Sequence, residues 1–243
     1  MRKLTATTIG LTLMAILAAL CTSEAQAAVI VQFTFPIAHG AGVETGSGFD
    51  ATTLASNVTA TPVADTSGNI IIGTENTSPN YSTAPVLRVN PNGNSASAAQ
   101  AVANSKYFSF TITPDAGYEL DLASLTFKAA RGGTSTPRGW VVRTSADAFA
   151  SDLAASDVAT VRPTWTDYTV SLTGTQFQDV TAPLTFRFYV YSPAAGSTIE
   201  FDNITVNGEV VAVIPEPAAG IMIIAGMALL INRRFGRTPS ALA

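Results

Sequence analysis

Cysteine, histidine and charged residues are scarce in this 243-residue chain, and each scarcity argues against a class of function. The single cysteine, Cys21, lies within an apolar N-terminal run, so the remaining chain has neither a disulfide framework nor a thiolate metal site. His39 is the only histidine, and no Gly-x-Ser-x-Gly motif accompanies it, which argues against a serine triad and a zinc site. We interpret His39 as a solvated loop residue.

Charged residues make up only 12% of the chain. Within residues 28–214, eight Lys and Arg stand against fifteen Asp and Glu, a net charge of −7. Such a segment offers no basic surface for nucleic acid, and its bulk charge opposes docking on anionic lipid or acidic polymer. Without cysteines, a domain in this segment must be held together by its core, aided at most by a bound ion.

The N-terminus has the three parts of a secretory signal peptide. Basic residues 2–3 precede an apolar run over residues 11–20, and Ala25 and Ala27 form an A-x-A site. We therefore predict that residues 1–27 are a signal peptide and that signal peptidase cuts after Ala27. Lipidation at Cys21 is the alternative, but a bulky leucine precedes this cysteine where a lipoprotein site needs a small residue.

The C-terminus carries an extended motif, an apolar run and a basic cluster. Pro215, Glu216 and Pro217 precede fourteen apolar residues, 218–231, and the arginines lie within 232–237. Fourteen helical residues extend about 21 Å, which is less than the roughly 30 Å hydrocarbon core. The span therefore depends on bilayer thinning and snorkelling arginines, which also hold that end in the cytoplasm. The two prolines keep the preceding segment extended and open to a processing enzyme.

This three-part tail resembles the PEP-CTERM sorting signal of Gram-negative bacteria, which the membrane protease exosortase reads. The resemblance covers residues 215–237 and implies transient anchoring in the inner membrane, then cleavage near Pro215, Glu216 and Pro217. It also implies release of residues 28–214 to the cell surface or the extracellular polysaccharide matrix. A plain C-terminal membrane anchor is the alternative interpretation.

Residues 28–214 are long enough for one domain with a sizeable core. Residues 40–100 are rich in Ala, Ser, Thr, Gly, Asn and Pro, which predicts a loop-rich half with short apolar islands. From residue 107 onward, apolar and polar residues alternate and predict strands. Only residues 146–155 suggest a helical turn or two. The strands are centred on 107–113, 125–127, 140–143, 168–172, 184–191 and 199–206.

The alternation also predicts the core and the fold class. The apolar residues of this alternation place four phenylalanines inside, and the polar positions place Arg187 and Tyr189 on the exposed face of the strand 184–191. In the last strand the apolar phase changes at Asp202 and Asn203, which predicts a β-bulge there. Many antiparallel strands without a long helix predict an all-β, two-sheet antiparallel jelly-roll sandwich. The phenylalanines predicted to be buried are Phe110, Phe127, Phe186 and Phe188.

Residues 107–210, with a Phe-Asp-Asn-Ile segment in the closing strand, resemble the domains that commonly precede PEP-CTERM tags. Those domains are carbohydrate-binding-module or galactose-binding-like jelly rolls. The resemblance covers just over half of the exported chain. It implies the same sandwich fold and a role without catalysis, with extracellular polysaccharide as the partner.

The candidate ligand-binding residues are Arg143, Arg187, Tyr189 and Tyr191. Aromatic rings stack on sugar rings, and arginine presents a fixed fork of donors to hydroxyls or carboxylates. The alternative is that these residues decorate an outer face for their strand propensity. A further segment, 131–139, carries two arginines in a Gly-rich loop that could meet an anionic group, although it lacks the pattern of a phosphate loop.

Glu200, Asp202 and Asn203 form the candidate cation site, because clustered carboxylate and amide oxygens suit structural calcium. The alternative is that they are solvated turn residues. Glu200 and Asp202 also resemble the start of the Glu-x-Asp-x-Glu signature of sandwich-fold glucanases, but Ile204 and Thr205 stand where the second glutamate would fall. Without that acid a retaining glycosidase cannot work, so we expect no enzyme and no required cofactor.

Two functions follow from the sequence. The first is a non-catalytic protein of the cell surface or matrix that is associated with exopolysaccharide or biofilm. The second is a carbohydrate-binding module with a defined glycan ligand.

Overall fold

A computed structural model describes residues 27–37, 48–75, 85–132, 137–161 and 164–213. Most of the predicted signal peptide and all of the predicted sorting signal, including Pro215, Glu216 and Pro217, lie outside the described residues. Among the described helices, none is long and apolar enough to cross a membrane.

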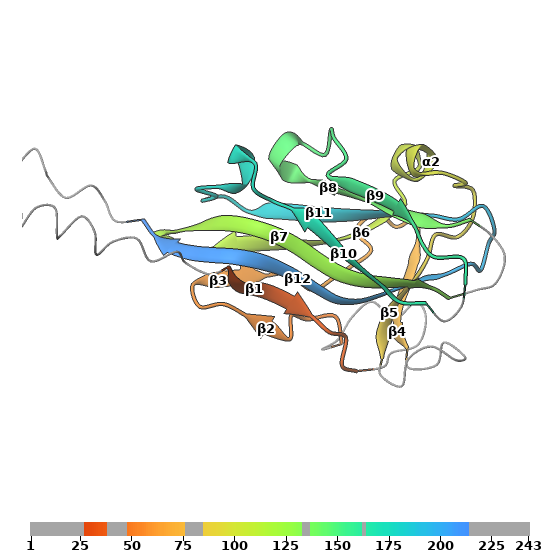
Figure 1. The fold of residues 1–243 in the computed structure, drawn as a ribbon, viewed down its shortest axis with the longest axis horizontal. Coiled ribbons are helices and arrows are strands. Elements are labelled where there is room, and N and C mark those ends of the chain that lie inside the picture. The colour runs from red at the N-terminus through yellow and green to blue at the C-terminus, as the bar shows by residue number, and fades with distance from the viewer. Residues whose placement is uncertain (1–26, 38–47, 76–84, 133–136, 162–163, 214–243) are drawn as a thin grey trace, which may run out of the picture.

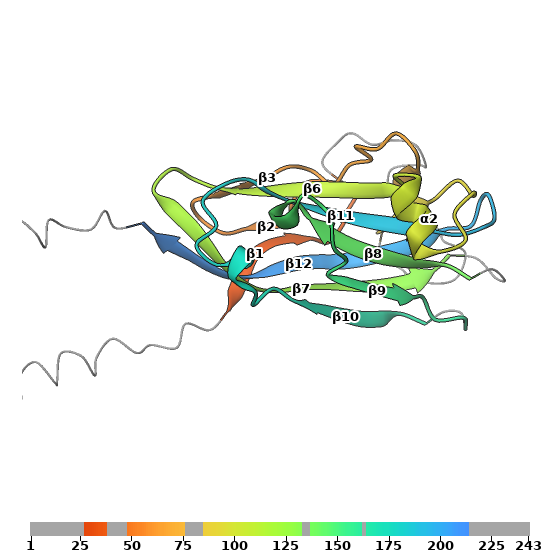
Figure 2. The same cartoon turned by 90° about the horizontal axis from the view of Figure 1, so that it is seen from above.

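The described residues form two antiparallel sheets packed face to face (Figures 1 and 2), which confirms the predicted jelly-roll sandwich. The larger sheet has the order β10-β7-β12-β1-β2, and β5 and β4 extend it beside β12. Its strands are β1 (Ala28–Phe33), β2 (Thr53–Leu54), β4 (Ile71–Glu75), β5 (Val86–Asn90), β7 (Tyr118–Arg131), β10 (Thr166–Ser171) and β12 (Ile199–Ala212). The five-stranded sheet has the order β3-β6-β11-β8-β9, with strands β3 (Val58–Ala60), β6 (Tyr107–Pro114), β8 (Gly139–Thr144), β9 (Ala154–Asp157) and β11 (Leu184–Tyr191).

Phenylalanine rings fill the space between the sheets. The Phe188 ring stacks on Phe108 of the neighbouring strand, with centroids 4.8 Å apart, and meets Phe127 of the opposite sheet edge-on at 5.2 Å. Phe110 and Phe186 form a second stacked pair. The four phenylalanines predicted to be core are all buried, so the predicted phase of strands β6, β7 and β11 is confirmed.

A bulge in β12 lies at the predicted place. The pairing of β12 with β7 shifts register between Asp202 and Thr205, and Asn203 has a φ of 52°. The extra residue turns Ile204 back toward the interior, so the residues before and after the bulge share one core. Without the bulge, the second half of the strand would present its apolar side chains to the opposite face.

Residues 40–100 contain more regular structure than the sequence predicts. Besides β2 to β5, this half includes the helix α2 (Ala98–Ala103), whose first turn is capped by the Ser97 hydroxyl accepting from the Gln100 amide. Within 146–155 the helical content is limited to the end of the 3-10 helix η1 (Ser145–Asp147), and β9 begins at Ala154. The other short helix is η2 (Thr175–Phe177).

The two ends of the described domain lie at one end of the sandwich (Figure 1). Ala28, at the start of β1, pairs with Gly208 near the end of β12, and the Val213 amide donates to the carbonyl of Gly117. The helix α2 lies at the other end, over the five-stranded sheet (Figure 2). The first and last described residues therefore lie at the end opposite α2.

Candidate functional site on the five-stranded sheet

The four predicted ligand-binding residues do lie together. Arg187, Tyr189 and Tyr191 alternate along β11 on the face turned away from the core, and Arg143 of β8 pairs directly with Arg187. This outer face is the surface that the sequence analysis assigned to ligand. Ligand binding there stays a prediction.

The tyrosine end of this face is covered. Tyr189 is only 4% exposed, so the expectation that it is exposed is wrong. The cause is α2, whose Ala101 packs with Tyr107, Tyr189 and Tyr191 in a small apolar cluster outside the main core. The Tyr107 and Tyr189 ring centroids are 5.0 Å apart. The tyrosines therefore support the helix and leave no open stacking platform at this end.

Tyr191 is held by its hydroxyl as well as by its ring. The hydroxyl donates to the carboxylate of Asp157 on β9. Burial raises the pKa of Tyr191 above its ordinary range, and the hydrogen bond and charge of Asp157 add to that effect. Tyr191 therefore stays protonated and joins β11 to the sheet edge, which is a structural role.

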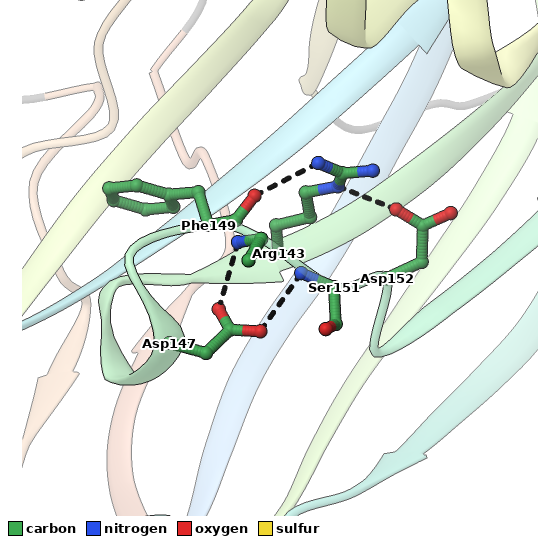
Figure 3. Close-up of polar contacts among 6 residues, drawn as sticks. Arg143, Asp147, Phe149, Ser151 and Asp152 are labelled. Atoms are coloured by element: carbon green, nitrogen blue, oxygen red, sulfur yellow. Dashed lines mark hydrogen bonds and ion pairs between the residues drawn. The ribbon is translucent and has the colours of Figure 1, made fainter.

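Arg143 organises the loop that follows β8. Its Nε lies 2.5 Å from Oδ1 of Asp152, and its Nη1 donates to the carbonyl oxygen of Phe149 at 2.9 Å (Figure 3). The side chain of Arg143 is 18% exposed, so solvent screens this ion pair only in part. One guanidinium thus ties both arms of the loop to the sheet.

The loop needs this support because its backbone is strained. Ala148 and Phe149 have φ values of 57° and 63°, a region that costs a non-glycine residue roughly 1–2 kcal/mol. The Asp147 carboxylate accepts from the amides of Ala150 at 3.2 Å and Ser151 at 2.9 Å (Figure 3). Desolvation raises the pKa of Asp147, but the hydrogen bonds from Ser151 and Ala150 outweigh it, and the pKa lies below its ordinary value.

The result of this loop geometry is a clamp on Arg187. The guanidinium carbon lies 3.6 Å from the ring centroid of Phe149 and 4.4 Å from that of Tyr107. Two aromatic faces therefore hold the cation from different elements, an arrangement stabilised by cation–π attraction. The Nε atom of Arg187 is buried and has no hydrogen-bond partner among the described residues.

Hydroxyl groups line the face beside Arg187. On β6, Ser109 pairs with Arg187, and its Oγ lies 2.7 Å from Oγ1 of Thr66. One step along the same face, the hydroxyls of Thr111 and Thr185 are 2.8 Å apart. Ser109 is buried, whereas Thr111 and Thr185 are half-buried. Hydroxyls both donate and accept, so the two threonines complement the fork of donors on the arginine. The candidate site is this part of the outer face, and we call it the Arg187 face.

The two arginines of segment 131–139 serve the fold. Arg138 is 2% exposed, and its Nη1 donates to the carbonyl of Thr198 at 2.6 Å. Burial lowers its pKa to about 10, aided by the charge of Arg131 and opposed by that of Glu200. Arg131 is also buried, and its Nη1 donates to the carbonyl of Thr160. Neither side chain presents its guanidinium at the surface.

The proposed calcium ligands face cations of the protein itself. Glu200 is fully buried and interacts electrostatically with Arg138. Asp202 interacts electrostatically with Lys128. Burial raises the pKa of Asp202, although its hydrogen bond from the Asn203 amide and the charge of Lys128 oppose the rise. In the part of the chain that the structure describes, no three or more His, Cys, Asp or Glu side chains gather in metal-binding geometry. Calcium binding stays a prediction.

Sequence reasoning missed Phe149, Tyr107 and α2 as parts of this face. The helix had a signal, since Ser97 is a good N-cap and six residues of Ala, Gln and Val follow it. Phe149 had none, because its position depends on two residues with positive φ that are neither Gly nor Asn.

No protein-family model and no curated protein matches the sequence. Several solved structures are similar to it. The CBM22-1 xylan-binding domain from Paenibacillus barcinonensis is 10% identical with a TM-score of 0.37, covering 75% of this chain and 95% of that domain. The K3 cleaved adhesin domain of Lys-gingipain from Porphyromonas gingivalis is 14% identical with a TM-score of 0.37, covering 75% and 99%. A CBM61 domain in complex with β-1,4-galactotriose is 11% identical with a TM-score of 0.34, covering 63% and 90%.

Proposed function

We propose that this protein is a non-catalytic carbohydrate-binding domain that is exported and displayed at the cell surface or in the extracellular matrix. The observation that carries the proposal is the clamped guanidinium of Arg187, held between two aromatic rings on the outer face of the sandwich. A side chain that is fixed before a ligand arrives loses little conformational entropy on binding. That preorganisation is typical of a recognition residue.

The neighbouring groups suit a sugar. Pyranose rings offer hydroxyls that both donate and accept hydrogen bonds, and the half-buried Thr111 and Thr185 place two hydroxyls on β6 and β11 beside Arg187. Phe149, which is half-buried, contributes an aromatic ring beside the same guanidinium. A shallow face of this composition binds by hydrogen bonds and partial stacking, with ordered water filling the gaps.

The proposal excludes glycosidase activity for the Glu200 and Asp202 pair. Glu200 is fully buried beside Arg138, so it has no open path to a sugar. A retaining glycosidase needs two carboxyl groups flanking the scissile bond. Replacing Glu200 with Gln is therefore expected to change stability and leave glycan affinity unchanged.

Delivery to the surface is the second part of the proposal, and it rests on the sequence. We propose that residues 1–27 direct export, that residues 28–214 are the mature domain, and that residues 215–237 are a PEP-CTERM signal cut by an exosortase-type protease. The described domain begins and ends at one end of the sandwich, away from α2 (Figure 1). These ends adjoin β1 and β12 of the larger sheet, whereas the Arg187 face is the outer face of the five-stranded sheet, so a tether there would leave the Arg187 face open.

Glycan binding is tested with the chain from residue 28 to 214, which contains every described strand. Affinity electrophoresis against a panel of plant and bacterial polysaccharides, and a glycan array, measure the ligand range. The proposal predicts retardation by at least one polysaccharide, reduced by Arg187→Ala. The proposal would be contradicted if no polysaccharide retarded the wild-type chain in the gels and the array gave no signal.

A further inference from the structure

We infer that the ligand of the Arg187 face is an acidic polysaccharide, and that Arg187 binds the carboxylate of a uronic acid residue. This inference rests on the proposed glycan-binding function and specifies its ligand class. Three properties of the face support it: the balance of charge, the geometry of the guanidinium and the aromatic surroundings of that cation.

The charges on this face are unbalanced. Arg143 and Arg187 are direct cross-strand partners, and like charges in that relation repel. Asp152 neutralises Arg143 through its 2.5 Å contact. Among the described residues, no carboxylate lies within ion-pair distance of Arg187. An arriving carboxylate would therefore neutralise Arg187, as Asp152 neutralises Arg143.

The geometry favours a planar anion. A guanidinium presents its donors in one plane, which matches the two oxygens of a carboxylate. Phe149 and Tyr107 fix that plane, because each ring contacts the guanidinium from its own element. The rings also exclude water from the cation, and this strengthens a charge-assisted hydrogen bond. The buried Nε leaves the terminal nitrogens as the donors available for ligand.

The net charge of −7 on residues 28–214 repels an acidic polymer at long range. Salt weakens this repulsion more than it weakens the direct contact at Arg187. Repulsion between charges more than a Debye length apart, about 8–10 Å near physiological salt, is largely screened. The contact at Arg187 is screened less. Affinity is therefore expected to hold or rise between about 20 and 200 mM NaCl, whereas binding through bulk positive charge falls steeply with salt.

The test compares polygalacturonate with the same polymer after reduction of its carboxyl groups to alcohols. Isothermal titration with the wild-type chain from residue 28 to 214 is expected to show at least about tenfold tighter binding to the acidic form, the effect of one charge-assisted hydrogen bond. Arg187→Lys keeps the charge but loses the fork, and it is expected to remove most of that preference. Lys128→Gln removes one cation from the other sheet and is expected to preserve the preference.

Each alternative outcome has a distinct meaning. Equal affinity for both polymers would overturn this inference and leave the proposed function intact, whereas binding to neither polymer nor to any other glycan would overturn both. If Arg187→Lys and Lys128→Gln lost the preference for the acidic polymer to the same extent, that preference would come from the bulk charge of the protein, and the inference would be overturned. Stronger binding of dextran sulfate than of polygalacturonate would show that the Arg187 face prefers a sulfate ester to a carboxylate. That result would also contradict the inference.

A second variant keeps the test valid if Arg187→Lys fails to fold. Phe149→Ala retains Arg187 and its charge but removes one wall of the clamp. Phe149 lies in a surface loop outside the main core, so the melting temperature is expected to stay close to that of the wild type. Severalfold weaker binding of polygalacturonate is expected, and unchanged binding would contradict a clamped carboxylate receptor.

Discussion

The clamp on Arg187 depends on a loop that Arg143 holds in place, and Arg143→Gln should release it. In the wild type, Ala148 and Phe149 store backbone strain of roughly 1–2 kcal/mol each. Against this, a charged hydrogen bond such as that to the Phe149 carbonyl contributes about 1.5–3 kcal/mol, and a partly exposed ion pair such as that with Asp152 about 0.2–1 kcal/mol. These terms nearly cancel, so losing Arg143 shifts the loop toward open conformations.

Limited digestion with chymotrypsin measures this opening directly, because the protease can cleave after Phe149 only when the loop has left the sheet. We expect the cleavage rate of Arg143→Gln at this bond to rise by about tenfold or more, as a shift of about 1.4 kcal/mol in the opening equilibrium implies. Lys128→Gln is the matched control, since it breaks an exposed 3.8 Å ion pair on the other sheet. A wild-type cleavage rate in Arg143→Gln would refute the role given to Arg143.

Three further predictions concern the core, the bulge and the tail. Phe188→Ala should lower the free energy of unfolding by about 3–5 kcal/mol in denaturant melts, because it removes a buried ring packed on Phe108 and Phe127; a loss below about 1 kcal/mol would contradict the packing. Asp202→Asn should raise the melting temperature at pH 7 but not at pH 3.5. Burial raises the pKa of Asp202, so its ionisation costs stability above the ordinary value of 3.8 and costs nothing below it; equal effects at both pH values would contradict this. Replacing residues 215–217 with alanine should leave the melting temperature of the domain unchanged and keep the full-length chain in the membrane fraction of its native host, and normal release would contradict the sorting proposal.

The sequence predicts the core well because its signal is local. In β11 every second residue is apolar, so the side chains that face the interior can be counted from the alternation alone. The bulge at Asp202 and Asn203 was equally predictable, because the two halves of a strand with opposite apolar phase can share one core only if an extra residue separates them. These features depend on neighbours along the chain.

The outer face was harder to predict because it depends on contacts between distant segments. Alternation places Tyr189 on the outer face of β11, but nothing within that strand shows that α2, which lies far earlier in the chain, covers it. The environment of Arg187 likewise depends on a strained loop after β8 and on β6. Sequence reasoning therefore selected the strand and the arginine, and missed the residues that hold this arginine in place.

The central claim is that ligand binds on the outer face of the five-stranded sheet at Arg187, and an NMR titration of ¹⁵N-labelled chain 28–214 tests it most directly. The Nε–Hε group of Arg187 is a reporter of its own, because it is buried and without a partner among the described residues. Titration with a galacturonate oligomer is predicted to shift this resonance together with amides of β6, β11 and the Phe149 loop. Shifts confined to the seven-stranded sheet or to the end that carries Ala28 and Val213, with the Arg187 resonance unchanged, would contradict the account.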